Sequence, residues 1–283
     1  MATTTNRPTL VLGANGKTGR RVADRLTAQD LPVHRGSRSG TPPFDWEDPS
    51  GWAGALDGMG AVYLSFYPDL SVPGAVETVG AFADAAVRHG VRRVVFLSGR
   101  GEAEAEQAED AVRAAGGDVT VLRATWFAQN FSEDYMLEHV LSGAVALPGG
   151  DTPEPFVDAD DIADVAVAAL TDDRHVGEVY ELTGPRLLTF AQAVHEISRA
   201  SGREIAYVPV SVAEHEAFCR EHGVPDEVVE LLTYLFTTVF DGRNAHVTDG
   251  VRRALGRDPR DFSEYACAAA ATGVWGEPSQ EVR

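Results

Sequence analysis

A glycine-rich segment near the start of the chain has the residue types and spacing of a phosphate-binding turn. It reads Gly13-Ala14-Asn15-Gly16-Lys17-Thr18-Gly19, between an apolar stretch at 9–12 and a stretch with helical apolar spacing at 17–28. In a strand–turn–helix unit, such glycines permit a tight turn and close approach of a pyrophosphate, while the helix N-terminus supplies N–H donors and a positive dipole. The alternative is an ordinary glycine-rich turn. We predict that a dinucleotide is bound by Gly13, Asn15, Gly16, Lys17, Thr18 and Gly19.

The residues after the second predicted strand, 33–36, should choose between NAD and NADP. At this position an acidic residue bonds the ribose 2′-hydroxyl of NAD, whereas an arginine accepts the 2′-phosphate of NADP. Here Arg38 lies just beyond the strand, and no acidic residue occurs before Asp45. The segment favours NADP(H), although solvated surface cations would give the same pattern. The first candidate for the phosphate contact is Arg38, and the secondary candidates are Ser37, Arg35 and Lys17.

Strand-like and helix-like stretches alternate through the first part of the chain, and this order positions the glycine-rich segment. The predicted strands are 9–12, 33–36, 61–66, 93–97 and 119–123. The predicted helices are 17–28, 74–89 and 104–115. Regular alternation of this kind is typical of parallel βαβ units.

The pattern becomes looser after Thr125. A helix is predicted near 130–141, and mainly helical sequence follows the last predicted strand. Between them lie β-like pieces at 144–147 and 155–157, helices at 161–170 and 190–200, and strands at 177–182 and 205–208.

No repeat or long linker divides the chain, so we predict one α/β domain over residues 1–283. It should be a Rossmann-type, doubly wound parallel sheet with a smaller C-terminal substrate lobe. Residues up to about 155 form the dinucleotide-binding core, and about 156–283 contribute the lobe.

Composition limits the partners. The formal charge of −19 and pI near 4.7 argue against a surface that neutralises phosphates, so nucleic acid is an unexpected partner. Neither cysteine has metal-site spacing, and the acids at 158–164 fall at a helix start, where they complement the dipole, so we predict no metal. The chain has no apolar stretch of about 20 residues and no apolar leader, so we expect a cytoplasmic protein without a membrane partner. A homodimer is the candidate assembly.

Three further motifs carry a family resemblance. They are Leu-Ser-Gly at 97–99, Arg-x-x-Trp-Phe-x-x-Asn-Phe at 123–131, and Phe-Val-Asp-x-x-Asp-Ile-Ala at 156–163. Together with the glycine spacing, they resemble the NmrA-like branch of the atypical short-chain dehydrogenases over most of the chain. Within that branch, the chain is similar to bacterial quinone-reductase-type members. The second motif also resembles the fungal festuclavine and agroclavine dehydrogenases, which reduce an iminium.

The resemblance implies a cofactor that lies across the carboxyl ends of the strands, in agreement with the general rule for open α/β sheets. It would be contacted by loops containing Phe66, Tyr67, Ser98 and Gly99. Aromatic residues of the second motif would lie near the nicotinamide or line the substrate pocket, although plain core packing explains them equally well. Tyr234, on a helix-like stretch at 228–240, has the same two interpretations. The candidate substrate-binding residues are Trp126, Phe127, Asn130, Phe131 and Tyr234.

The chain departs from the short-chain dehydrogenase pattern at the proton donor. Typical members carry a Tyr-x-x-x-Lys pair, but the corresponding helix here is strongly acidic, and the only lysine of the sequence is Lys17. A quinone or iminium is already electrophilic and needs less help from a side-chain acid than a ketone. Tyr67, Ser98 or water remain candidate proton donors for a ketone. Glu102 or Glu106 is a candidate to stabilise a substrate cation, the alternative being a solvated helix face.

We therefore expect an NADPH-dependent reductase that transfers hydride to an apolar, aromatic or polycyclic small molecule. A quinone, an imine or iminium, and a ketone all remain open as substrates. The alternative function is a non-catalytic NADP-binding sensor that regulates a partner protein.

Overall fold

The computed structural model describes residues 7–276, which fall into two compact units. The first takes in the chain up to Ala124, together with Ala159–Leu182 and Asp249–Arg257. The second takes in Thr125–Asp158, Thr183–Thr248 and the chain from Asp258. The chain therefore passes repeatedly between the units, and this grouping interleaves segments that a single division near residue 155 would keep apart.

The first unit is built on a six-stranded parallel sheet with the strand order β2-β1-β3-β4-β5-β7. Strands of such sheets are covered on both faces and are therefore apolar throughout. All four residues of β3 are buried, as this rule requires. The strands are β1 (Thr9–Leu12), β2 (Val33–Gly36), β3 (Ala61–Leu64), β4 (Arg93–Gly99), β5 (Asp118–Ala124) and β7 (Val179–Leu182). The predicted Rossmann-type parallel sheet is confirmed.

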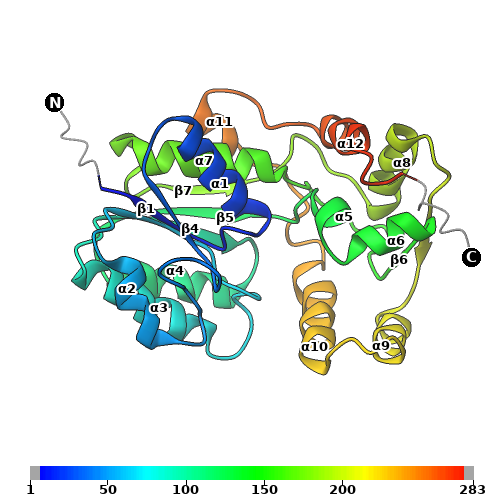
Figure 1. Ribbon diagram of the computed structural model, residues 1–283. Helices are drawn as coiled ribbons and strands as arrows, with labels where there is room; N and C mark the ends of the chain where they lie inside the picture. Colours follow the sequence, from blue (N-terminus) through cyan, green and yellow to red (C-terminus); the bar gives the residue numbers. More distant parts are fainter. Residues whose placement is uncertain (1–6, 277–283) are drawn as a thin grey trace, which may run out of the picture. The chain divides into compact units, whose positions relative to one another are not determined.

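Helices cover both faces of this sheet (Figure 1). One face carries α1 (Lys17–Ala28), α7 (Ala159–Thr171) and α11 (Gly250–Leu255). The other carries α2 (Trp52–Leu56), α3 (Ala75–Arg88) and α4 (Ala103–Ala114). Short 3-10 helices lie at Pro49–Gly51 and Asp173–His175.

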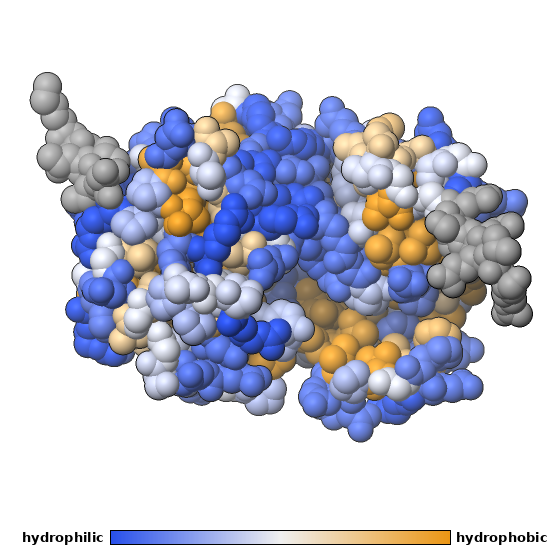
Figure 2. Space-filling view, viewed as in Figure 1, coloured by the Kyte–Doolittle hydropathy of each residue, from blue (hydrophilic) through white to orange (hydrophobic). Residues whose placement is uncertain are grey.

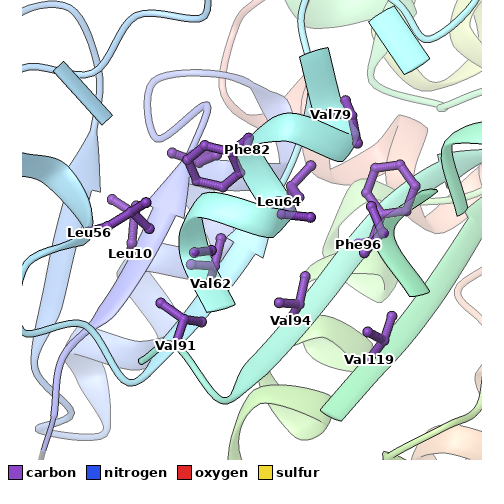
Figure 3. Packing of buried hydrophobic residues seen from close by; sticks show 14 of the residues in the cluster. Leu10, Leu56, Val62, Leu64, Val79, Phe82, Val91, Val94, Phe96 and Val119 are labelled. Atoms are coloured by element: carbon purple, nitrogen blue, oxygen red, sulfur yellow. The ribbon is translucent and has the colours of Figure 1, made fainter. Parts of the chain in front are cut away.

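The core beneath α3 is aliphatic with a few aromatic rings. Figure 3 shows Phe82 and Val79 of α3 lying over Val62 and Leu64 of β3, with Phe96 of β4 beside them. All five side chains are fully buried. At about 1.5–3 kcal/mol for each large apolar side chain, burial of this kind fixes α3 on the sheet.

The second unit combines short helices with a two-stranded parallel sheet of β6 (Ala144–Leu147) and β8 (Ala206–Pro209). Its core is aromatic, with Phe190 packed against Phe131, Phe156 and Phe240. Figure 2 shows hydrophobic surface gathered around α9 and α10. The helices are α5 (Asn130–Glu133), α6 (Met136–Ser142), α8 (Phe190–Ser201), α9 (Val212–Glu221), α10 (Asp226–Tyr234), a π-helix (Leu235–Val239) and α12 (Phe262–Ala271).

Two expectations for the second unit are wrong in detail. The helix expected at 130–141 is two helices, because the backbone of Asp134 is extended (φ −148°, ψ −170°) between α5 and α6. Residues 155–157 form no strand but only an isolated bridge between Phe127 and Val157. The stretch at 228–240 is helical as expected, and it changes from α-helix to π-helix at Leu235. Within the described residues, no helix is long and apolar enough to cross a membrane.

Ion pairs hold α7 to its neighbours in the first unit. Arg25 of α1 contacts Asp160 at 2.5 Å and Asp164 at 2.6 Å, and Arg257 contacts the fully buried carboxylate of Asp161 at 2.7 Å. Burial disfavours ionisation of Asp160, but the hydrogen bond from Arg25 outweighs it and leaves the pKa of Asp160 below its ordinary value. The acids at this helix start therefore have structural partners.

We predict that Arg257→Ala lowers the free energy of unfolding by about 1–3 kcal/mol, because it removes a charged partner from a buried carboxylate. Arg88→Ala is the control, since the ion pair of Arg88 with Asp84 is exposed and should contribute less than about 1 kcal/mol. Chemical denaturation of both variants measures the difference. Equal losses would contradict the structural role assigned to Arg257.

Candidate dinucleotide-binding site

The turn between β1 and α1 is shaped by three glycines with different tasks. Gly13 has a left-handed backbone (φ +62°), which favours glycine. Gly16 is the extended N-cap residue of α1, and its N–H donates to the carbonyl oxygen of Gly13 at 2.8 Å. A Cβ atom on Gly19 would lie 2.3 Å from that same carbonyl oxygen. Close contact between the helix backbone and the turn therefore requires glycine at position 19.

The same turn has the properties of an anion site. Gly13, Asn15 and Gly16 are exposed, whereas Thr18 and Gly19 are buried against the fold. The first turn of α1 contains no acidic side chain that would compete for the positive end of its dipole. N–H groups at a helix start bind phosphates in this arrangement, so the residues present fit a dinucleotide pyrophosphate.

Strand order places this turn at the edge where open α/β sheets bind ligands. The strands β2 and β3 pair with β1 from opposite sides, so the chain reverses its direction of progress across the sheet at β1. Ligands bind outside the carboxyl ends of the strands at such a switch point. Ser65, just after β3, has its Oγ 3.6 Å from the position of a Cβ on Gly13. The structure thus brings the turns after β1 and β3 together.

Residues after β3 differ in their exposure at this edge. Phe66 is partly buried and packs against Trp46, with the two ring centroids 4.9 Å apart. Tyr67 is 75% exposed. Of the two residues predicted to contact the cofactor here, Tyr67 is the one whose ring is open to a ligand.

The cations after β2 are not equivalent. Arg35 bonds Asp24 at 2.6 Å and is thereby occupied. Arg38 is exposed and makes no ion pair with any residue that the structure describes. Ser37 lies between them, with its Oγ 3.4 Å from that of Ser39. Arg38 therefore stays the first candidate for the phosphate contact.

Ser98 is held inside the first unit. It is 3% exposed, and its hydroxyl donates to Glu109 Oε1 at 2.7 Å. Arg123 binds both carboxylate oxygens of the fully buried Glu109, at 2.7 Å each. A hydroxyl whose proton is committed to a buried carboxylate is poorly placed to protonate a substrate, which argues against Ser98 as the proton donor.

A second buried acid lies at the same end of β4. Glu102, the N-cap residue of α4, is 8% exposed, and its side chain makes no capping hydrogen bond. Burial, with smaller contributions from Asp69 and Glu104, raises the pKa of Glu102 to about 8. The sequence predicts that Glu102 lies either on a solvated acidic helix face or beside a substrate cation. The only local signal against that interpretation is its position before the helix start.

The candidate substrate residues all belong to the second unit, but their surroundings differ. Phe131 is fully buried among Phe156, Phe190 and Phe262. Packing therefore accounts for Phe131 without a ligand.

Trp126 is partly buried and lies beside Phe236 and Phe240, with ring centroids 5.3 and 5.5 Å apart. The remaining three are also partly buried, so they retain surface that a ligand could contact. They are Phe127, Asn130 and Tyr234.

Comparison with known proteins decides the family. The sequence profile of the NmrA-like family matches residues 44–266. The chain belongs to this family. It is 32% identical to the uncharacterized oxidoreductase YesF of Bacillus subtilis, over 95% of this chain and 98% of that protein. It is 29% identical to agroclavine dehydrogenase of Claviceps fusiformis, over 90% of this chain and 95% of the other.

A solved structure supports the fold. The NADPH-dependent quinone oxidoreductase QOR2 of Escherichia coli, complexed with NADPH, superimposes with a TM-score of 0.73. The alignment covers 92% of this chain and 99% of the other, at 21% sequence identity. The predicted membership of the NmrA-like family is confirmed.

We predict that the protein binds NADP(H) more tightly than NAD(H), and that Arg38→Ala reduces this preference because it removes the cation expected at the 2′-phosphate. Calorimetric titration with both dinucleotides measures it. Arg35→Ala is the matched control and should retain the preference, since Arg35 is paired with Asp24. Equal affinity of the wild type for both cofactors would contradict the assignment.

Gly16→Val should abolish dinucleotide binding while the chain stays folded. The backbone of Gly16 is extended (φ −84°, ψ 178°), and a Cβ there meets only the Gly13 carbonyl oxygen, at 3.3 Å. The added side chain would instead fill space required by the pyrophosphate. Circular dichroism and calorimetry separate folding from binding. A folded variant with unchanged affinity would remove the phosphate-binding role.

Proposed function

We propose that the protein is an NADPH-dependent reductase that transfers hydride to an apolar, electrophilic small molecule. The observation that carries the proposal is the glycine-rich turn at the switch point of the sheet, together with Arg38 two residues after β2 and no acidic residue between β2 and Asp45. Relatives of similar length support it, since YesF is an oxidoreductase and the Claviceps protein a dehydrogenase.

The residues of the chain have distinct tasks in this reaction. A bound NADPH supplies the hydride from its nicotinamide ring. The turn from Gly13 to Gly19 holds the pyrophosphate, and Arg38 binds the 2′-phosphate. Tyr67, which is 75% exposed after β3, would contact the bound cofactor. Holding the two reacting centres at a fixed distance converts a bimolecular reaction into a unimolecular one.

The substrate should be electrophilic because the usual Tyr-x-x-x-Lys pair is missing. The helix α4 carries Glu104, Glu106 and Glu109 instead. We propose quinones, imines and aromatic ketones as the substrate classes, and aromatic residues of the second unit, Trp126 foremost, as their contacts. Apolar rings of this kind stack favourably on aromatic side chains.

A panel of quinones, cyclic imines and aromatic ketones tests the proposal, with NADPH oxidation as the readout. The wild type should reduce at least one class, and Gly16→Val should reduce none. Tyr67→Phe should retain most turnover, because an electrophilic substrate needs no proton from this exposed hydroxyl. A loss of about 10²-fold in Tyr67→Phe would make Tyr67 the general acid.

The alternative function is a dinucleotide sensor that regulates a partner protein. Tight NADPH binding without any turnover across the panel would support the sensor and contradict the reductase.

A further inference from the structure

The carboxyl group of Glu102 lies where a side chain on Gly99 would otherwise be. A Cβ atom on Gly99, the last residue of β4, would lie 2.2 Å from Glu102 Oε1 and 2.5 Å from its Cδ. The carboxyl group therefore rests directly on the backbone at the carboxyl end of β4. This is possible only because residue 99 has no side chain.

The carboxyl group has no partner of opposite charge. Glu102 makes no side-chain hydrogen bond or ion pair with the residues that the structure describes. The charged groups that face it are both acids, Asp69 from the loop after β3 and Glu104 from α4. The nearest arginine in sequence, Arg100, contacts Glu181 at 3.2 Å.

This environment favours the neutral acid. An N-cap carboxylate is ordinarily stabilised by the first N–H groups of its helix, but Glu102 accepts no such hydrogen bond. Burial comes first among the causes that raise its pKa to about 8, and Asp69 and Glu104 add to it. At neutral pH the group therefore carries a proton that it can give away.

We propose that Glu102 is the general acid of the reductase and that the natural substrate is a carbonyl or quinone, whose oxygen must be protonated. This inference rests on the proposed function. It also narrows that function, because an iminium becomes a neutral amine on gaining hydride alone, whereas a carbonyl or quinone needs a hydride and a proton.

With a ketone, each bond that forms is matched by a bond that breaks. The substrate carbon forms a bond to the hydride, which leaves the nicotinamide C4 of NADPH with both electrons of its C–H bond. The electron pair of the C=O bond moves to oxygen, which takes the proton from the carboxyl of Glu102 as that O–H bond breaks. The products are an alcohol, NADP⁺ and a Glu102 carboxylate, which regains its proton from water.

Infrared difference spectroscopy tests the protonation state without substrate or cofactor. The wild type should show a carboxylic-acid band that disappears as pH rises through about 8. The band should be missing in Glu102→Gln and present in Glu106→Gln, a matched control whose carboxylate is 62% exposed. A wild type with no protonated carboxyl group at pH 7 would overturn the proposal.

Thermal unfolding gives a second readout in the cofactor-free protein. The folded-state pKa of Glu102 lies above its ordinary value of 4.5, so its contribution to stability is complete below about pH 4.5 and is lost as pH rises through about 8. Glu102→Gln cannot ionise and should lack this loss between those values. Glu106→Gln should keep it.

Turnover identifies the role in the reaction. With a ketone or quinone, Glu102→Gln should lower kcat by about 10²-fold with little change in KM. Asp110→Asn, which changes an 83% exposed acid of the same helix, should behave like the wild type. With a cyclic iminium, Glu102→Gln should retain its rate. If the wild type reduces carbonyls and Glu102→Gln is equally fast, this proposal fails while the reductase stands. If the wild type binds NADPH and reduces nothing, the reductase itself fails.

Discussion

The backbone of α1 lies against the turn that follows β1, with Gly19 beside the carbonyl oxygen of Gly13 at a distance that leaves no room for a Cβ atom. This contact aims the N-terminus of α1 at the carboxyl edge of the sheet. Arg25 then ties α1 to α7 through two aspartates on the same face. The position of the anion site therefore depends on a backbone contact that one methyl group would prevent.

The chemistry at that edge is set by which polar groups are already paired. The carboxylate of Glu109 accepts hydrogen bonds from Arg123 and Ser98, so both of its oxygens have partners. Glu102, seven residues earlier at the N-cap of α4, has no such partner. The environments of the two buried carboxyl groups therefore differ, because Glu109 is paired with a cation whereas the charged neighbours of Glu102 are acids.

Much of the first unit could be predicted from the sequence, because its signals are local. The bounds of β1, α1 and β2 match the prediction, since apolar periodicity and the glycines mark each boundary. The second unit was predicted less well, and its clearest error lies at Asp134, where a local hydrogen bond accompanies a break in the helix. The extended backbone at Asp134 interrupts an otherwise helical pattern, and its own side chain accepts a hydrogen bond from the N–H of Tyr135.

The candidate site divides in the same way. The glycine-rich turn and Arg38 could be proposed as cofactor contacts from spacing alone, whereas the burial of Glu102 depends on Gly99 and on the loop after β3. An alternating run of Glu and Ala does not indicate which of its side chains will be buried in the fold. Phe131 shows the reverse case, since a residue in a family motif is explained by its place in the aromatic core.

A crystal structure of the protein with NADP tests the central claim most directly. We expect the pyrophosphate over Gly13 and Gly16 at the N-terminus of α1, with the 2′-phosphate beside Arg38. A dinucleotide bound elsewhere on the first unit, or a 2′-phosphate remote from Arg38, would contradict it.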